Sequence, residues 1–113
     1  MERNGHQIIA ERKLQGEAHE YVVLIGLPFR EVPANENESP YFVCPWWIED
    51  ENGVVAKKMN VGGEDSVQAL VLALAMIGDV LSLAWEEPVI WIDGIPGSCF
   101  PNSRGEWIKT QGI

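Results

Sequence analysis

Residues 65–85 form the one long apolar run in this chain, and they constrain the fold more than any other stretch. Asp65 is suited to cap the N-terminus of a helix, and Gln68, three residues later, completes a capping box. Pro88 disfavours helix at the residue before it, so we expect the helix to end at 85–87. The sequence therefore predicts a single long helix around which the other segments are arranged.

The apolar residues of this helix cover more of its circumference than a simple surface helix requires. Those predicted to face a sheet follow helical spacing and are Val67, Leu70, Val71, Leu74, Ile77, Leu81 and Ala84. A second apolar stripe consists of Leu72, Met76, Val80 and Leu83. We expect the segment 94–113, with its Trp107 and Ile108, to cover this stripe. The alternative is a homodimer in which two copies pack helix to helix.

The same run approaches the ~20 residues that a membrane-spanning helix needs. Asp79 lies well inside it and would be costly in lipid, and no Lys or Arg cluster flanks it. The first residues also lack the apolar core of a signal peptide. We therefore predict a cytoplasmic protein that does not enter a membrane, in which Cys44 and Cys99 are reduced and packed as small apolar groups.

Five other segments show the composition and alternation of strands. They are residues 8–14, 21–27, 41–49, 54–61 and 88–93. Asn52-Gly53 lies between two of them and is a strong marker of a type I′ hairpin turn. The order β-β-β-β-α-β predicts an α+β fold, in which an antiparallel sheet of about five strands carries one long helix on one face.

With 113 residues, the chain is expected to be a single domain, 1–113. We expect residues 1–6 to be frayed and residues 30–40 to form a loop. Residues 102–113 are interpreted as a tail that could dock on the body.

The net charge of −9 argues against direct binding to nucleic acid, because phosphate contacts need Lys and Arg. Acidic charge serves solubility first, but it also favours encounter with a basic protein. Trp46 and Trp47 are neighbours on a strand and point to opposite faces. Either one of them is exposed beside the acidic hairpin, or the tryptophan there belongs to the core beside a solvated turn, which is the more common outcome. The predicted partner-binding residues are Glu36, Glu38, Trp47, Glu49, Asp50 and Glu51. We therefore interpret the chain as an interaction module, of the immunity or antagonist type, that neutralises a basic toxin or nucleic-acid enzyme.

The alternative is a small-molecule-binding domain or an enzyme with a pocket between helix and sheet. Its predicted lining residues are Cys44, Trp46, Asp93 and Cys99. His6 and His19 do not have the spacing of metal ligands. Gly97-Ser98-Cys99 lacks the G-x-S-x-G spacing of a nucleophile elbow. The sequence thus predicts no catalytic residue, no metal site and no cofactor.

The start of the helix, residues 63–70, resembles a family of small bacterial domains of unknown function whose helix opens with Gly-x-Asp-Ser-x-Gln-Ala-Leu. Further segments match that family in order, namely Ala10-Glu11-Arg12, Val23-Leu24-Ile25-Gly26-Leu27-Pro28, Cys44-Pro45-Trp46-Trp47-Ile48 and Phe100-Pro101. The resemblance implies a fold and a bacterial origin. It implies no activity, because the family has no established catalytic residues. The tail after Phe100-Pro101 is longer than the family pattern.

Overall fold

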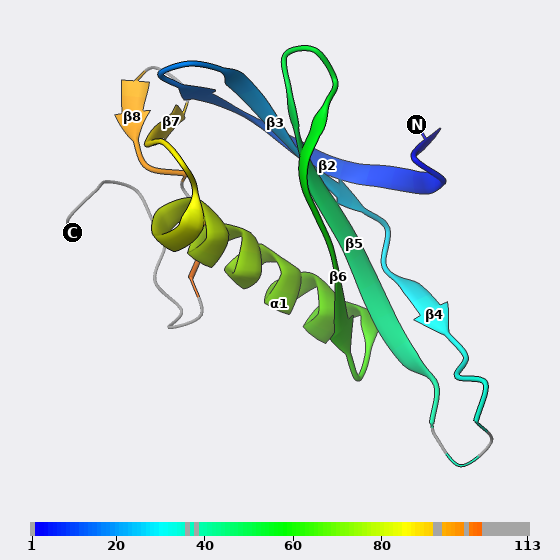
Figure 1. The fold of residues 1–113 in the computed structure, drawn as a ribbon. Helices are drawn as coiled ribbons and strands as arrows, with labels where there is room; N and C mark the ends of the chain where they lie inside the picture. The colour runs from blue at the N-terminus through cyan, green and yellow to red at the C-terminus, as the bar shows by residue number, and fades with distance from the viewer. Residues whose placement is uncertain (1, 36, 38, 92–93, 99, 103–113) are drawn as a thin grey trace.

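The structure is a computed structural model that describes residues 2–35, 37, 39–91, 94–98 and 100–102. Seven strands form one antiparallel sheet in the order β6-β5-β3-β2-β7-β8, and β4 also pairs with β5 (Figure 1). The strands are β2 (His6–Gly16), β3 (Glu20–Gly26), β4 (Phe29–Glu31), β5 (Tyr41–Asp50), β6 (Val55–Gly63), β7 (Val89–Trp91) and β8 (Ile95–Pro96). The short β1 (Glu2–Arg3) pairs with β2. A helix packs against β5 and β6, so the predicted α+β fold is confirmed.

The helix begins as the sequence predicts. The side chain of Asp65 accepts a hydrogen bond from the backbone N–H of Gln68 at 2.7 Å. The side chain of Gln68 in turn accepts from the backbone N–H of Glu64 at 2.7 Å, one residue before the expected partner. Helix α1 (Ser66–Asp79) continues into a π-helical turn, η1 (Val80–Ala84), and Trp85 is extended. The helix thus ends at Ala84, one residue before the predicted range of 85–87.

The face that α1 turns to the sheet agrees only in part with the predicted one. Ala69, Ala73 and Ile77 are fully buried against it, whereas Val67 and Val71 are 68% and 54% exposed. The prediction gave weight to large apolar residues, but the small alanines allow the helix backbone to approach the sheet. Of the other residues predicted to face the sheet, Leu81 is buried, Leu70 and Leu74 are half-buried, and Ala84 is exposed.

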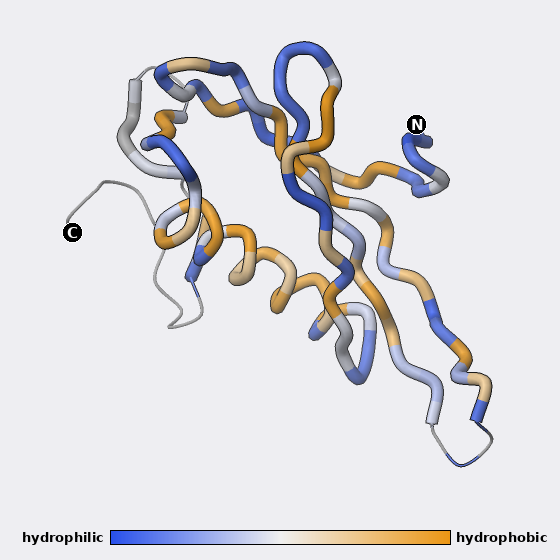
Figure 2. Tube along the Cα trace, in the orientation of Figure 1, coloured by the Kyte–Doolittle hydropathy of each residue, from blue (hydrophilic) through white to orange (hydrophobic). Residues whose placement is uncertain are grey.

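The second apolar stripe of the helix is only partly covered by the residues that the structure describes. Met76 and Val80 pack against the core, but Leu72 is 44% and Leu83 82% exposed. Figure 2 shows hydrophobic residues along most of the helix. By length and composition, Ser66–Ala84 could also cross a membrane. Of the segment predicted to cover the stripe, residues 94–113, the part 103–113 lies outside the described residues, so the cover stays a prediction.

Both faces of the sheet bury large side chains. On the face toward α1, the core includes Leu14, Tyr21, Val23, Ile25, Cys44, Trp46, Ile48 and Val61. On the opposite face Leu24 and Trp47 are fully buried. The ring of His6, at the start of β2, lies 6.0 Å from the ring of Trp47. The N-terminal end of the chain therefore helps to cover the face that the helix leaves open.

Two local predictions, the frayed N-terminus and the start of the loop, need correction. Residues 2–6 are not frayed, because Asn4 and Gly5, with φ of 54° and 80°, form a two-residue turn between β1 and β2. Positive φ at both positions is the signature of type I′. Residues 30 and 31, placed in a loop, belong to strand β4 because pairing with β5 resumes after Pro28.

The hairpin at Asn52-Gly53 is present, but its turn is not type I′. Gly53 has φ 77°, whereas Asn4 is the one non-glycine residue with positive φ among those described. The side chain of Asp50 accepts hydrogen bonds from the backbone N–H groups of Asn52 and Val54, at 2.8 and 3.0 Å. These bonds favour a longer loop that needs positive φ only at the glycine.

Candidate functional site

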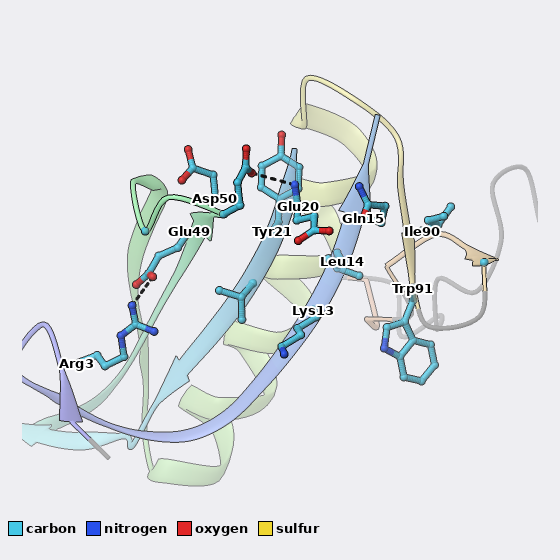
Figure 3. A pocket seen from close by; sticks show the side chains of 14 residues that line it. Arg3, Lys13, Leu14, Gln15, Glu20, Tyr21, Glu49, Asp50, Ile90 and Trp91 are labelled. Atoms are coloured by element: carbon cyan, nitrogen blue, oxygen red, sulfur yellow. Dashed lines mark hydrogen bonds and ion pairs between the residues drawn. The ribbon is translucent and has the colours of Figure 1, made fainter. Parts of the chain in front are cut away.

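A groove of about 600 Å³ lies at the end of the sheet where the β5–β6 hairpin, β2, β3 and β7 meet (Figure 3). Val23 and Ile48 pack toward α1, so by strand alternation their neighbours Val22 and Glu49 point to the opposite face, where the groove opens. The groove is lined by Arg3, Lys13, Leu14, Gln15, Glu20, Tyr21, Val22, Glu49, Asp50, Glu51, Gly53, Ile90, Trp91 and Gly94.

The register of the strands fixes the floor of the groove. Lys13 of β2 is paired with Val22 of β3, and Val22 is paired with Glu49 of β5. Glu20 is paired with Gln15 and is therefore a diagonal neighbour of Lys13. An apolar side chain thus lies between charged residues of both signs.

A buried carboxylate lies at one side of the groove. Glu49 is only 3% exposed, and its Oε2 accepts a hydrogen bond from Nε1 of Trp47 at 2.7 Å. Its Oε1 accepts from the guanidinium of Arg3 at 2.5 Å, visible as a dashed line in Figure 3. Burial removes the carboxylate of Glu49 from water, and each of its two oxygens accepts a hydrogen bond from a charged or polar donor instead. The contact also holds β1 against the sheet.

The acidic rim of the groove comes mainly from the β5–β6 hairpin. One carboxylate oxygen of Glu51 accepts from the backbone N–H of Glu20 at 3.0 Å, and the other lies 2.9 Å from Nδ1 of His19. The hydrogen bond and the negative charge of Glu51 raise the pKa of His19 above its ordinary value. The same hydrogen bond with His19 lowers the pKa of Glu51. These contacts therefore favour the ionised form of Glu51 and tie its side chain to the turn before β3.

Two charged side chains of the groove remain open for a ligand. The ammonium of Lys13 and the carboxylate of Glu20 form no hydrogen bond or ion pair with any residue that the structure describes. The carboxylate of Asp50, by contrast, is occupied by the hairpin turn. Lys13 and Glu20 are thus charged groove residues whose side chains have no polar contact with any described residue.

The predicted partner-binding residues divide into three groups. Trp46 and Trp47 do point to opposite faces, and both are fully buried, so the core alternative holds and Trp47 is not exposed to a partner. The reason is the N-terminal hairpin, which covers Trp47. Glu49 is buried beside it, whereas Asp50 and Glu51 lie at the rim of the groove. Glu36 and Glu38 lie outside the described residues.

The predicted pocket between helix and sheet finds no support in the residues that can be placed. Cys44 and Trp46 are fully buried in the core, and burial raises the pKa of the Cys44 thiol to about 11. Neither residue lines the groove or the two smaller pockets of about 260 and 240 Å³. Asp93 and Cys99 lie outside the described residues. Within the described part of the chain, no three His, Cys, Asp or Glu side chains are grouped to hold a metal ion.

Sequence reasoning missed Arg3, Lys13 and Glu20. A signal for Arg3 was present, because Asn4-Gly5 between short polar segments is the same dipeptide that marks a hairpin at residues 52–53. Lys13 and Glu20 carried no separate signal, since they are ordinary polar residues at the exposed positions of two strands.

The comparison with known proteins gives one family and no close relative of known function. Residues 10–101 match the family model described as a domain of unknown function, DUF6968. No curated protein and no solved structure matches the chain. The match covers well over half of the sequence and includes the helix start, most of β2, all of β3 and β5, and the Phe100-Pro101 segment on which the resemblance rested. The chain therefore belongs to the DUF6968 family of domains of unknown function.

Proposed function

We propose that this domain is a protein-interaction module that docks a basic segment of another protein at the acidic end of the groove. The observation that carries the proposal is the carboxylate of Glu20, which has no partner among the described residues and lies next to an apolar floor. Asp50 and Glu51 add negative charge at the same rim. A Lys or Arg side chain would find a charge-assisted contact there and would lay its aliphatic stem on Val22.

The charge of the whole chain supports the same class of partner. A net charge of −9 attracts basic proteins and speeds their encounter, most strongly at low ionic strength. An immunity-type or antagonist protein that neutralises a basic toxin or nucleic-acid enzyme would act in this way. In this proposal Glu20 replaces Trp47 as the central contact, because the indole of Trp47 is buried.

Affinity capture from the native host, at low and at high salt, tests the proposal. The wild-type domain should retain a basic protein at low salt and release it at high salt, because screening weakens contacts between exposed charges. Glu20→Gln should retain several-fold less of the same protein. Glu64→Gln is the matched control, since it removes one exposed carboxylate that does not line the groove. Failure to retain a basic protein at either salt, or equal losses in both variants, would contradict the proposal.

A further inference from the structure

The groove carries positive as well as negative groups, which a purely basic ligand would not use. Arg3 and Lys13 lie along one side, and Glu20 and Asp50 along the other (Figure 3). Lys13 and Glu20, as diagonal neighbours, are separated by ~7–8 Å between their Cα atoms. A ligand that satisfies the groove therefore needs an anionic and a cationic group joined by a short apolar stem.

Arg3 is held in place for binding an anion. Its guanidinium donates to Glu49, and Trp47 fixes that carboxylate from the other side. A guanidinium has five N–H donors, so this contact leaves others, and the side chain of Arg3 is 39% exposed at the groove. Together with the ammonium of Lys13, it offers the combination of donors that binds a carboxylate.

We infer that the groove receives the C-terminal residue of a partner chain, and that this residue is lysine or arginine. Its carboxylate lies between Arg3 and Lys13, its cationic group lies beside Glu20, and its stem crosses Val22. An internal lysine or arginine supplies the cation but no carboxylate, and would leave Arg3 and Lys13 without a ligand. The inference rests on the proposed function and specifies the part of the partner that is recognised.

Calorimetric titration of the full chain with two synthetic peptides tests this inference. Both peptides have an acetylated N-terminus and end in Leu-Ala-Lys, one with a free C-terminal carboxylate and one with an amide. The free-carboxylate peptide should bind about tenfold more tightly, which corresponds to the loss of one charge-assisted contact in the amide. Free lysine should bind more weakly than that peptide, because it lacks the preceding residues.

Two groove variants separate the carboxylate contact from the cation contact. Lys13→Met should lower the affinity for the free-carboxylate peptide by about tenfold and leave the affinity for the amidated peptide unchanged. Glu20→Gln should lower the affinity for both peptides. Neither side chain has a partner among the described residues, so both variants should keep the wild-type melting temperature. Lys57→Met and Glu64→Gln, exposed and outside the groove, are the matched controls.

Three outcomes would overturn the inference. If both peptides bind equally well and Glu20→Gln binds neither, the groove does not recognise a chain end. The proposed docking of basic segments would then remain intact. Absence of binding of either peptide would also overturn the inference. The capture experiment would then test the proposed function separately. Free lysine binding as tightly as the peptide would assign the groove to a free amino acid instead.

Discussion

Nε1 of Trp47 donates a hydrogen bond of 2.7 Å to the carboxylate of Glu49, and both residues are buried on the sheet face that the helix does not cover. A buried carboxylate without hydrogen-bond donors would destabilise the folded protein. The guanidinium of Arg3 completes the arrangement and ties the first strand of the chain to the centre of the sheet. The short N-terminal hairpin is therefore part of the fold and forms one side of the groove.

Arg3→Met should lower the free energy of unfolding by about 2 kcal/mol. This is less than the ~3–5 kcal/mol of a fully buried pair, because Arg3 is partly exposed. The loss arises because Glu49 stays buried with only Trp47 as its donor. Urea denaturation measures the difference, and Arg3→Lys, which keeps the charge, should lose less.

A double-mutant cycle with Glu49→Gln tests whether the two side chains act as a pair. Once Arg3 is replaced by methionine, removing the charge of Glu49 should cost less than it does in the wild-type protein. Strictly additive losses, or wild-type stability of Arg3→Met, would show that the N-terminal hairpin is not anchored through this contact.

Gly63→Ala should destabilise the protein by about 2 kcal/mol, in the range of overpacked sites. A Cβ on Gly63 would lie 2.4 Å from the backbone N of Ala69, and backbone at the helix start cannot move aside cheaply. The neighbouring Gly62→Ala is the matched control, because its Cβ would meet no atom within 3.9 Å. Thermal melts of both variants measure the difference. Equal melting temperatures would mean that the helix start does not approach β6 this closely.

The pair formed by His19 and Glu51 should make stability depend on pH. Because the folded pKa of His19 is raised from 6.5, its contribution is fully present below pH 6.5 and is lost as the pH rises through the raised value. Because the folded pKa of Glu51 is lowered from 4.5, its contribution is present above pH 4.5 and is lost as the pH falls through the lowered value. The contribution of the pair is thus largest between these two pH values.

Titration of the His19 ring by NMR measures this coupling directly. Its pKa should lie above 6.5 in the wild-type protein and should fall toward 6.5 in Glu51→Gln, which lacks the negative charge. Glu87→Gln should lower the pKa of His19 less than Glu51→Gln does, because the charge of Glu87 raises that pKa less than Glu51 does. A wild-type pKa at or below 6.5 would contradict the contact.

The elements predicted from the sequence are those with a strong local signal. Asp65 and Gln68 mark the helix start by side-chain chemistry that needs no tertiary contact, and the long strands follow from alternation. The predicted helix face was right in part, since Ile77 and Leu81 are buried in the core. It wrongly included Val67 and Val71 and left out the alanines, because the buried face depends on how closely two backbones approach. That distance is set by Gly63 and Ala69, which contribute little to a hydrophobic pattern.

The candidate site was harder to predict because its residues come together only through tertiary structure. Arg3 and Glu49 are 46 positions apart and meet through the turn at Asn4-Gly5. Asp50 and Glu51 of the acidic hairpin, predicted to bind a partner, line the groove, and their role in binding stays a prediction. The sequence pattern did not show that Trp47 would be covered, since the cover is supplied by residues expected to be frayed.

The second apolar stripe of the helix leaves two leucines exposed. Leu72 and Leu83 are 44% and 82% exposed among the described residues, and burying a leucine stabilises a protein by roughly 1.5–3 kcal/mol. If residues 102–113 supply the cover, as we predict from Trp107 and Ile108, a chain without them should aggregate or melt several degrees lower. Light scattering coupled to gel filtration, together with thermal melts, measures both effects. A truncated protein with the wild-type melting temperature and the mass of a dimer would assign the cover to a second copy, and Leu83→Asp should then convert that dimer to a monomer.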